Sequence, residues 1–286
     1  MLPILFALVA YFGWGAGDVL LGLSSRKIGS FLTTFWLYGL GLIILLPLIP
    51  FLSDQLSNIT PSTLILTVIL GIISSIGVLA FTEGLKIGNA SIVGTITSAF
   101  SAVVVVLSVI FLGEKLSPNQ IGAILIIFAG IILCSLNLKD VKEKNLLNKG
   151  TIFALVAMIT WGINYTFIKI PIQQFGWFWP GYIQNIGCAI LFSILILRKD
   201  RKFLIDKRKG FPLLFMAVLL PTVGTLGFNY ALSIGQSSIV APVAGSSITL
   251  FVLLSRFAFK DRLSKQQWIG ILTALLGIVL LAFFSK

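Results

Sequence analysis

The 286-residue sequence contains no histidine and only two cysteines. Histidine is the commonest catalytic base and metal ligand near neutral pH, so its absence argues against most metal-dependent and hydrolytic enzymes. Cys134 and Cys188 both lie inside apolar runs, which disfavours a disulfide framework and a thiolate metal site. We therefore expect no metal site, no cofactor and no enzymatic activity.

Charged residues are also scarce, since they make up 10% of the chain against 57% hydrophobic residues, with a mean hydropathy of +1.06. Soluble domains contain roughly 25% charged and 45–50% apolar residues. A helix that crosses a hydrocarbon core of about 30 Å needs about 20 apolar residues. Backbone groups in lipid must be hydrogen-bonded within their own segment, so the composition predicts an all-α integral membrane protein.

Apolar stretches follow one another along the chain, bounded by glycine, proline, asparagine or charged residues. Two basic segments interrupt them most clearly, residues 137–149 with four lysines and residues 198–210 with seven Lys and Arg. We expect ten transmembrane helices, at residues 2–21, 31–52, 62–84, 91–112, 119–137, 150–170, 177–197, 211–233, 238–259 and 266–284.

Acidic residues are the rarer charged class, with nine Asp and Glu against 21 Lys and Arg. No nucleic-acid-binding motif accompanies the positive charge, so nucleic acid is not an expected partner. Ten crossings leave only Lys115, Lys169 and Lys286 on the side of the two termini, and the other 18 basic residues on the opposite side. Because cytoplasmic loops carry the excess of Lys and Arg, we expect a multi-pass plasma-membrane protein with both termini outside.

The sequence repeats itself at an offset of 147 residues. The Trp-Gly pair at Trp14 recurs at Trp161, and Gly29 recurs as Gly176. The segment FTEGLKIGNASIV at 81–93 aligns without a gap with FNYALSIGQSSIV at 228–240. Membrane helices resemble one another in composition, but agreement at one constant offset indicates a duplication.

The duplication predicts a first five-helix repeat at residues 1–137, a cytoplasmic linker at 138–149 and a second five-helix repeat at 150–286. Five is an odd number of crossings, so the second copy enters the membrane from the opposite side. The expected fold is therefore two inverted five-helix repeats. Many secondary transporters have this arrangement, with the substrate site near the membrane midplane between the copies.

These features together resemble the EamA-type carriers of the drug/metabolite transporter superfamily over nearly the whole chain. The matching features are the Trp-Gly pair in the first helix of each half, the Ser-rich turns at 88–91 and 235–238, and the acid-base pairs at 114–115 and 261–262. The resemblance implies a ten-helix, mostly monomeric carrier of a small molecule. It also implies a central cavity lined by the first, third and fourth helices of each half, but no particular substrate or direction.

Two acidic residues, Asp18 and Glu83, lie inside apolar stretches. Intramembrane carboxylates are costly and are functional candidates by default. At a rise of 1.5 Å per residue, Asp18 lies about 24 Å along the first helix, and Glu83 is expected at a similar depth in the third. With no histidine present, these two residues are the candidates for proton coupling. The alternative is that both reach the interface, with Glu83 paired to Lys86 one turn on.

The repeat pairs these acids with phenols, and polar or aromatic residues flank each position. Tryptophans one turn from Asp18 and from its counterpart Tyr165 lie on the same helix face. Serines on the fourth and ninth helices offer hydroxyls, although serine also bonds its own helix backbone. The residues expected to contact substrate are Trp14, Asp18, Glu83, Ser98, Trp161, Asn164, Tyr165, Asn229, Tyr230 and Ser247.

No Lys or Arg lies in the middle of a predicted span, since Lys169 and Arg256 lie near helix ends. This pattern disfavours phosphorylated anions and leaves a neutral solute, a zwitterion, or an organic cation held by a carboxylate and aromatic faces. The expected function is secondary-active transport of a small metabolite, such as an amino acid, a sugar or an organic cation, by alternating access. The accompanying hypothesis is that transport is coupled to protons.

Two other classes of protein remain as alternatives. A channel or lipid scramblase would conduct without saturation or countertransport. Residues 15–18 (Gly-Ala-Gly-Asp) match the Gly-x-Gly-Asp pattern of intramembrane aspartyl proteases. That chemistry requires two aspartates that share a proton, and the chain has no second aspartate inside an apolar stretch.

Overall fold

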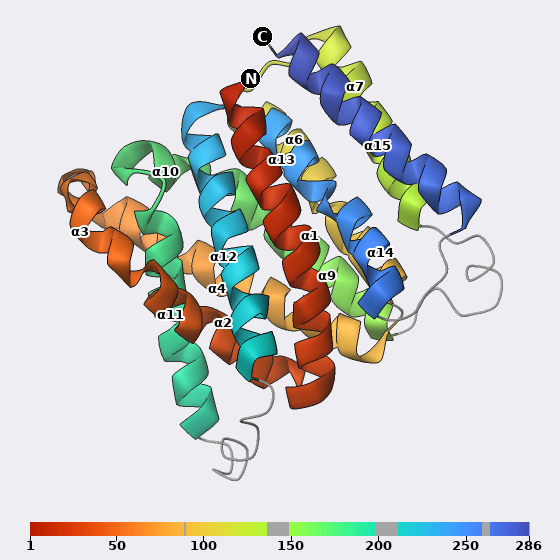
Figure 1. Cartoon of the computed structure of the whole chain (residues 1–286). Helices are drawn as coiled ribbons and strands as arrows, with labels where there is room; N and C mark the ends of the chain where they lie inside the picture. Colours follow the sequence, from red (N-terminus) through yellow and green to blue (C-terminus); the bar gives the residue numbers. More distant parts are fainter. Residues whose placement is uncertain (89, 136–148, 198–210, 259–263, 286) are drawn as a thin grey trace.

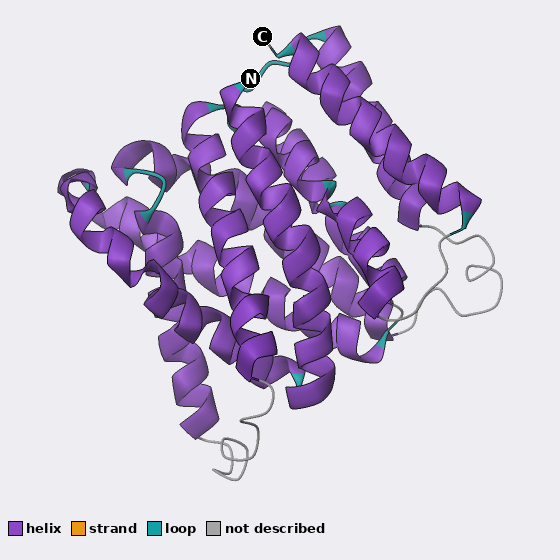
Figure 2. Ribbon diagram, in the orientation of Figure 1, coloured by secondary structure: helices purple, strands orange, loops and turns teal. Residues whose placement is uncertain are grey.

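The computed structural model describes residues 1–88, 90–135, 149–197, 211–258 and 264–285. Within this part of the chain every regular element is a helix and there is no strand (Figure 2). The two termini lie at the same end of the molecule (Figure 1). The predicted linker at 138–149 lies, except for Lys149, outside the described residues, as do Asp261 and Arg262.

The helices of the first half are α1 (Leu2–Ile28), α2 (Ser30–Leu45), α3 (Ile49–Leu52), α4 (Pro61–Ile87), α5 (Ala90–Ser98), α6 (Phe100–Phe111) and α7 (Pro118–Ser135). Short 3-10 turns at Leu46–Leu48 and Ser53–Asn58 flank α3. The helices of the second half are α9 (Lys149–Phe167), α10 (Lys169–Phe175), α11 (Trp179–Leu197), α12 (Phe211–Ile234), α13 (Ser237–Gly245), α14 (Ser247–Ala258) and α15 (Lys265–Phe284).

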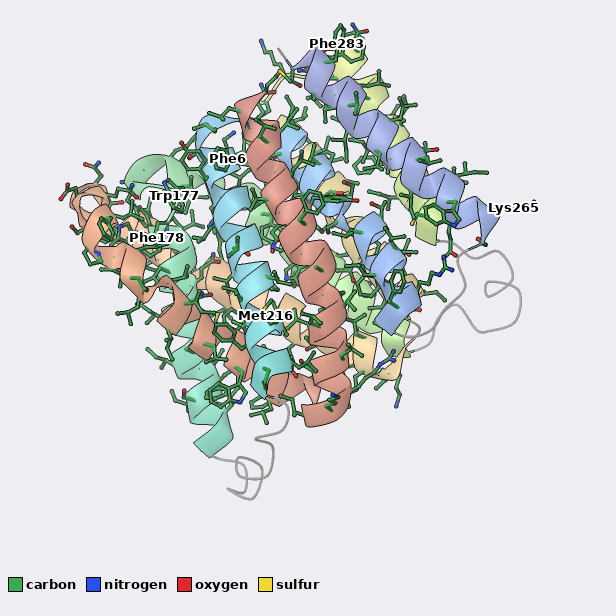
Figure 3. The ribbon with its side chains drawn as sticks, in the orientation of Figure 1. Phe6, Trp177, Phe178, Met216, Lys265 and Phe283 are labelled. Atoms are coloured by element: carbon green, nitrogen blue, oxygen red, sulfur yellow. The ribbon has the colours of Figure 1, made fainter. Side chains whose placement is uncertain are left out.

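Eight helical segments of the described chain are long and apolar enough to cross a membrane. Their outer surfaces are apolar as well. On α15, Leu272 is 63% exposed and Val279 is 65% exposed, and Phe283 points away from the body of the molecule (Figure 3). An apolar surface of this extent is typical of helices that face lipid.

The first helix is longer than the sequence pattern predicted. We expected it to end near residue 21, but α1 continues through the polar run Ser24–Ser25 to Ile28. Both serines are buried, and the hydroxyl of Ser25 donates to the carbonyl of Gly22 at 2.9 Å, so this side chain is satisfied within its own helix. Asp18 therefore lies well within α1 and not close to its end.

Local backbone geometry recurs at the 147-residue offset. Gly29 and Gly176 have φ angles of 86° and 85°. The breaks between α5 and α6 and between α13 and α14 fall at Ala99 and Ser246, with φ and ψ of −65° and −5° in the first and −69° and −3° in the second. These two pairs of aligned positions therefore adopt the same backbone conformation.

The positive φ of Gly29 predicts a measurable effect of adding a β-carbon there. Gly29 has φ 86° and ψ 150°, a region that costs a residue with a side chain about 1–3 kcal/mol. We expect Gly29→Ala to lower the thermal unfolding temperature in detergent. Gly39→Ala is the matched control, because Gly39 lies inside α2 with open space around it and alanine favours a helix by about 0.5–1 kcal/mol. Equal shifts in both variants would contradict the role of the backbone conformation.

Helices of the two halves pack against each other in reciprocal pairs. α1 packs along α12, and α4, the counterpart of α12, packs along α9, the counterpart of α1. α7 packs along its own counterpart α15 at one edge of the molecule (Figure 1). Counterpart helices of the two halves therefore take part in the same kinds of contact.

Close contacts at glycines follow the same reciprocity. A β-carbon at Gly224 would lie 2.9 Å from Cδ1 of Trp14, and one at Gly77 would lie 2.7 Å from Cδ1 of Trp161. At the 147-residue offset Gly77 corresponds to Gly224 and Trp161 corresponds to Trp14, so the two contacts are equivalent. The glycines thus allow each tryptophan to pack against the backbone of the other half.

Candidate substrate-binding cavity

The central helices enclose a cavity between the two halves. Its lining comes from α1, α2, α4, α5, α6, α9, α11, α12, α13 and α14, and not from α7 or α15. Eight of the ten predicted substrate contacts line it: Trp14, Asp18, Ser98, Trp161, Asn164, Tyr165, Asn229 and Ser247. The cavity therefore gathers residues that are far apart in sequence into one site.

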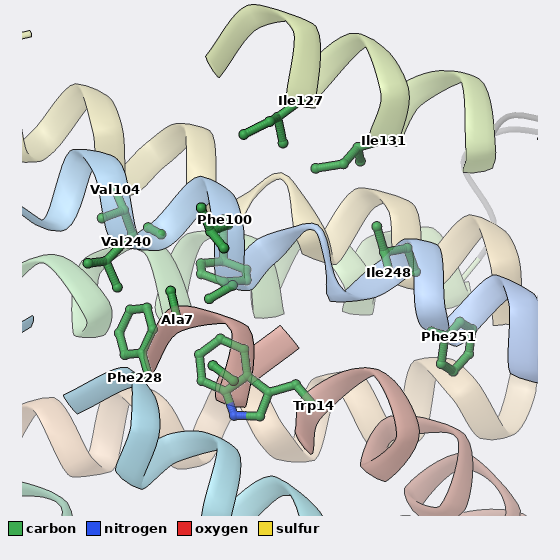
Figure 4. Packing of buried hydrophobic residues seen from close by; sticks show 14 of the residues in the cluster. Ala7, Trp14, Phe100, Val104, Ile127, Ile131, Phe228, Val240, Ile248 and Phe251 are labelled. Carbon is green, nitrogen blue, oxygen red and sulfur yellow. The ribbon is translucent and has the colours of Figure 1, made fainter. Parts of the chain in front are cut away.

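Aromatic rings form a substantial part of the cavity lining. Trp14 stacks on Tyr165 with ring centroids 5.2 Å apart, and Phe228, which is behind the lining, supports Trp14 at 5.0 Å. Phe100 packs edge-on against Trp161 at 6.2 Å. Trp14, Phe100 and Phe228 converge from three different helices (Figure 4). Ring faces arranged in this way bind apolar bodies and cations.

Asp18 is the only charged side chain among the described residues that line the cavity. It lies one turn beyond Trp14 on α1 and is partly buried. The described residues offer it neither an ion pair nor a hydrogen bond, because the two salt bridges of this part of the chain join Glu83 to Lys86 and Glu114 to Lys169. A carboxylate without a partner in a largely apolar cavity is costly, and a bound cation would supply the partner.

Four buried polar atoms of cavity-lining residues have no hydrogen-bond partner among the described residues. They are the hydroxyl oxygen of Tyr38, Oγ1 of Thr97, Nε1 of Trp161 and Oδ1 of Asn229. Buried polar groups in folded proteins are nearly always paired. Unpaired donors and acceptors around one cavity are therefore available for hydrogen bonds to a bound molecule.

Other polar groups in the cavity are already paired. Nε2 of Gln184 donates to Oδ1 of Asn164 at 3.0 Å, and Nε1 of Trp14 donates to Oγ1 of Thr225 at 3.2 Å. The hydroxyl of Ser98 donates to the carbonyl of Thr95 in its own helix at 2.7 Å. These bonds hold Asn164 and Trp14 in fixed orientations toward the cavity.

The bond from Gln184 to Asn164 leads to a prediction about stability. Gln184→Met keeps the size of the side chain but leaves the buried Oδ1 of Asn164 without its donor, which costs about 1–3 kcal/mol. We expect a lower unfolding temperature in detergent. Gln173→Met, at an exposed position of α10, is the matched control and should change the temperature little. A Gln184→Met protein as stable as the parent would contradict this role.

Glu83 and Tyr230 lie outside the cavity lining. The Glu83 carboxylate accepts a hydrogen bond from Ser30 and pairs with Lys86 at 3.1 Å on the surface of α4. Tyr230 packs between Phe6 and Trp177, with centroid distances of 4.3 Å and 5.5 Å (Figure 3 labels both neighbours). The two positions are equivalent at the 147-residue offset, so the same helix face turns both away from the cavity.

The sequence reasoning missed contributions from the second helix of each half. Tyr38 on α2 and Gln184 and Asn185 on α11 line the cavity. Tyr38 and Asn185 are equivalent at the offset, so a polar group at matching positions of two apolar stretches was the signal that could have identified them. The resemblance had implied only the first, third and fourth helices.

Lys169 also differs from its predicted setting. The sixth helix was expected to end at residue 170, but after a break at Ile168 the chain continues as α10 to Phe175. Lys169 thus lies inside a helical segment and is buried, with its Nζ 2.7 Å from Oε1 of Glu114. The ion pair neutralises this lysine, and no Lys or Arg is among the described residues that line the cavity.

An all-helical chain with many apolar crossings around an internal cavity defines a multi-pass membrane protein. The EamA-like transporter family model matches residues 1–136 and 148–283, so the chain belongs to that family. Homologues in this family are transporters and not enzymes. A membrane transporter of the drug/metabolite transporter superfamily is therefore the class that the sequence and the fold define.

Two curated relatives and one solved structure are similar to this chain. An uncharacterized protein of Methanocaldococcus jannaschii is 28% identical over 136 residues, which is 48% of this chain and 98% of the relative. A protein of Archaeoglobus fulgidus described as an uncharacterized transporter is 23% identical over 285 residues, 98% of each chain. A crystal structure with 14% sequence identity matches the fold with a TM-score of 0.77 over 99% of this chain and 97% of the other.

Proposed function

We propose that this protein is a secondary-active carrier that moves a small organic cation through the central cavity by alternating access, in exchange for protons. The observation that carries the proposal is Asp18, a carboxylate without an ion-pair partner in a cavity otherwise lined by aromatic, apolar and neutral polar residues. A cation and a proton neutralise this carboxylate equally well. The two therefore compete for it, which couples their movements without a second ion site.

The remaining residues of the proposed site bind the body of the substrate. Aromatic faces contact an apolar or cationic group, and the unpaired polar atoms supply hydrogen bonds. The proposed substrate contacts are Trp14, Asp18, Ser98, Trp161, Asn164, Tyr165, Asn229 and Ser247. Glu83 and Tyr230 are not part of this site, because they lie outside the lining.

Alternating access follows from an inverted repeat of two five-helix units. The proposed crossings are the eight apolar segments together with α7 and α11. The reciprocal packing of α1 on α12 and of α9 on α4 supports a two-fold relation between the halves. Rocking of one half against the other then exposes a fixed site to each side of the membrane in turn.

The proposed setting is the plasma membrane, with a monomeric protein that contacts lipid and a small-molecule substrate. The excess of Lys and Arg opposite the termini supports external termini and cytoplasmic basic loops. Single cysteines at Ser285 and Lys207, in a variant without Cys134 and Cys188, test this orientation in intact cells. An impermeant thiol reagent should label the first and spare the second, and the reverse labelling contradicts the orientation.

Ligand charge is tested first by binding to the purified protein. Phenethylammonium, phenylalanine and phenylpropionate share one aromatic ring and present a cation, a zwitterion and an anion. We expect the cation to raise the unfolding temperature most and the anion not to raise it. Equal effects of the cation and the anion would contradict a role of Asp18 in selecting charge.

Transport is tested with the permanently charged phenethyltrimethylammonium in proteoliposomes. A carrier should show saturable uptake and counterflow, and an inward-acidic pH gradient should drive accumulation. A channel or scramblase would give uptake that does not saturate and no counterflow, and that result would overturn the proposed mechanism. Empty liposomes provide the background rate.

A further inference from the structure

Glu114 lies at the centre of a buried polar cluster that is separate from the cavity. It follows α6 in the connection to α7 and is 8% exposed. Its carboxylate accepts hydrogen bonds from Nζ of Lys169 at 2.7 Å and from the Ser238 hydroxyl at 2.6 Å, and also from the backbone N–H groups of Ser237 and Ser238, each at 2.8 Å. Burial raises the pKa of Glu114, but the hydrogen bonds from Lys169 and the two serines lower it by more than burial raises it. The pKa of Glu114 therefore lies below that of a free glutamate.

The partners of Glu114 come from two helix junctions of the second half. Lys169 follows the break at Ile168, and its Nζ also donates to the carbonyl of Gly235 at 2.8 Å, between α12 and α13. Ser237 and Ser238 open α13, so their N–H groups have no partner inside the helix. A carboxylate at this position satisfies them and interacts favourably with the helix dipole.

The cluster joins the two halves at the end of the molecule that carries the termini. Glu114 belongs to the first half and its partners to the second. A β-carbon at Gly235 would lie 2.5 Å from Cβ of Pro3, and Gln120 at the start of α7 donates to the Ser285 hydroxyl at 3.4 Å, which identifies this end. We call it the terminal face, and the end that carries Arg26 the opposite face.

The lysine of the cluster has no counterpart at the equivalent position of the first half. At the 147-residue offset Lys169 corresponds to Gly22, which has no ammonium group. The backbone equivalents do recur, because a β-carbon at Gly88 would lie 3.2 Å from Cα of Gly150, and Gly88 and Gly150 are the counterparts of Gly235 and Pro3. The two faces therefore share a backbone arrangement, and the lysine of the terminal face has a glycine at the equivalent position of the opposite face.

The cluster is connected to three helices that line the cavity. Lys169 directly follows Ile168 and lies one turn beyond Tyr165, and both of these residues line the cavity. Gly235 directly follows the helix that carries Asn229, and Ser238 lies in the first turn of α13, which leads to Ser247. When Glu114 separates from its partners, the ends of the α9–α10 segment, α12 and α13 lose this contact with the first half. The inner faces of these helices surround the proposed substrate site.

We propose that Glu114, Lys169 and the start of α13 form a latch that holds the terminal face closed and separates when that face opens. The latch rests on the alternating-access function proposed above. A buried ion pair repays little more than its desolvation cost, so it is a poor source of general stability. It is well suited to favour one conformation, because it is strong only while both partners are in contact.

The latch is tested by labelling of the cavity from each face. Ser247→Cys provides the reporter in a variant with Cys134→Ala and Cys188→Ser, and an impermeant thiol reagent is applied to right-side-out and to inside-out membrane vesicles. We expect Lys169→Met and Glu114→Gln to raise the labelling rate from the terminal face by about tenfold or more and to lower it from the opposite face. A reciprocal change is a shift between two conformations, which loosening alone does not produce.

Two matched controls accompany these variants. Lys115→Met removes an exposed charge next to Glu114, and Glu83→Gln breaks the surface ion pair with Lys86. Neither should change the ratio of the two labelling rates. Labelling rates that stay unchanged in the latch variants, or that rise from both faces, would overturn the latch.

Ser238→Ala covers the case in which the stronger variants do not fold. It removes one hydroxyl donor and keeps the ion pair and both backbone bonds. We expect a smaller shift in the same direction, and no shift would overturn the latch. Equal labelling of the parent from both faces would instead contradict alternating access, and the latch with it, so the two failures are distinguishable.

Discussion

Asp18→Asn is expected to abolish accumulation of a cationic substrate driven by a pH gradient, while the protein still folds and inserts. Asparagine has nearly the size of a protonated aspartate, so packing on α1 is kept. The variant has lost the group that binds either a proton or a cation. Removal of a charge-assisted contact costs about 1.5–3 kcal/mol, or roughly 10- to 150-fold in affinity for the cation. Uptake in proteoliposomes with and without a pH gradient measures the effect.

The neighbours of Asp18 in the cavity sharpen this expectation. The other titratable residues of the described lining are Tyr38, Tyr165 and Tyr182, and no Lys, Arg or Glu is present there. Glu83→Gln is the matched control, since Glu83 lies outside the lining. It should leave driven accumulation intact. An Asp18→Asn protein that concentrates the cation as well as the parent does would show that Asp18 is not the coupling residue.

Gly130→Val is expected to destabilise the protein strongly by separating α7 from α15. A β-carbon at Gly130 would collide with the backbone N of Ala274 and lie 2.7 Å from its Cα, and a backbone in a packed helix cannot move aside. Overpacking of this kind typically costs about 1–3 kcal/mol. We expect a cost near the upper end of this range, because the added side chain collides with the backbone of α15. The unfolding temperature in detergent provides the measurement.

Gly122→Val is the control for this effect on the same helix. Nothing lies within 4 Å of a β-carbon at Gly122, so valine there adds the same side chain to α7 without a collision. The difference between the two variants isolates close packing from helix propensity. Equal destabilisation by both would contradict the role of Gly130 in the contact with α15.

Much of the fold could be predicted from hydropathy and the repeat, because lipid leaves a helix as the main option for each apolar stretch. Interruptions inside the stretches could not. We expected one helix at 31–52, but α2 ends at Leu45 and is followed by a 3-10 turn and by α3. Pro47 lies in the first turn of the 3-10 segment and Pro50 in the first turn of α3. The break at Ala99 has no glycine or proline beside it, so no local signal marked it, whereas the equivalent break at Ser246 directly follows Gly245 in a helix that contains Pro242.

The candidate site could be predicted only in part. Aromatic, acidic and polar residues in apolar stretches identified eight of the 31 lining residues, and the repeat grouped them by position. The expected depth of Glu83 in the membrane did not reveal that its side chain points away from the cavity. The direction of a side chain depends on how its helix packs against the neighbouring helices. The ion pair of Glu114 with Lys169 joins positions 55 residues apart in different halves. The sequence pattern had grouped Glu114 with the adjacent Lys115 instead.

The replacement of Lys169 by Gly22 at the equivalent position bears on the thermodynamics of a duplicated protein. In a chain with two identical inverted halves, the conformation open to one side would be related to the conformation open to the other side by a two-fold rotation. The two conformations would then have equal free energies in a symmetric environment. An ammonium present in one half and absent from the other removes that degeneracy. A single diverged position between the halves is then enough to set a resting preference for one side of the membrane.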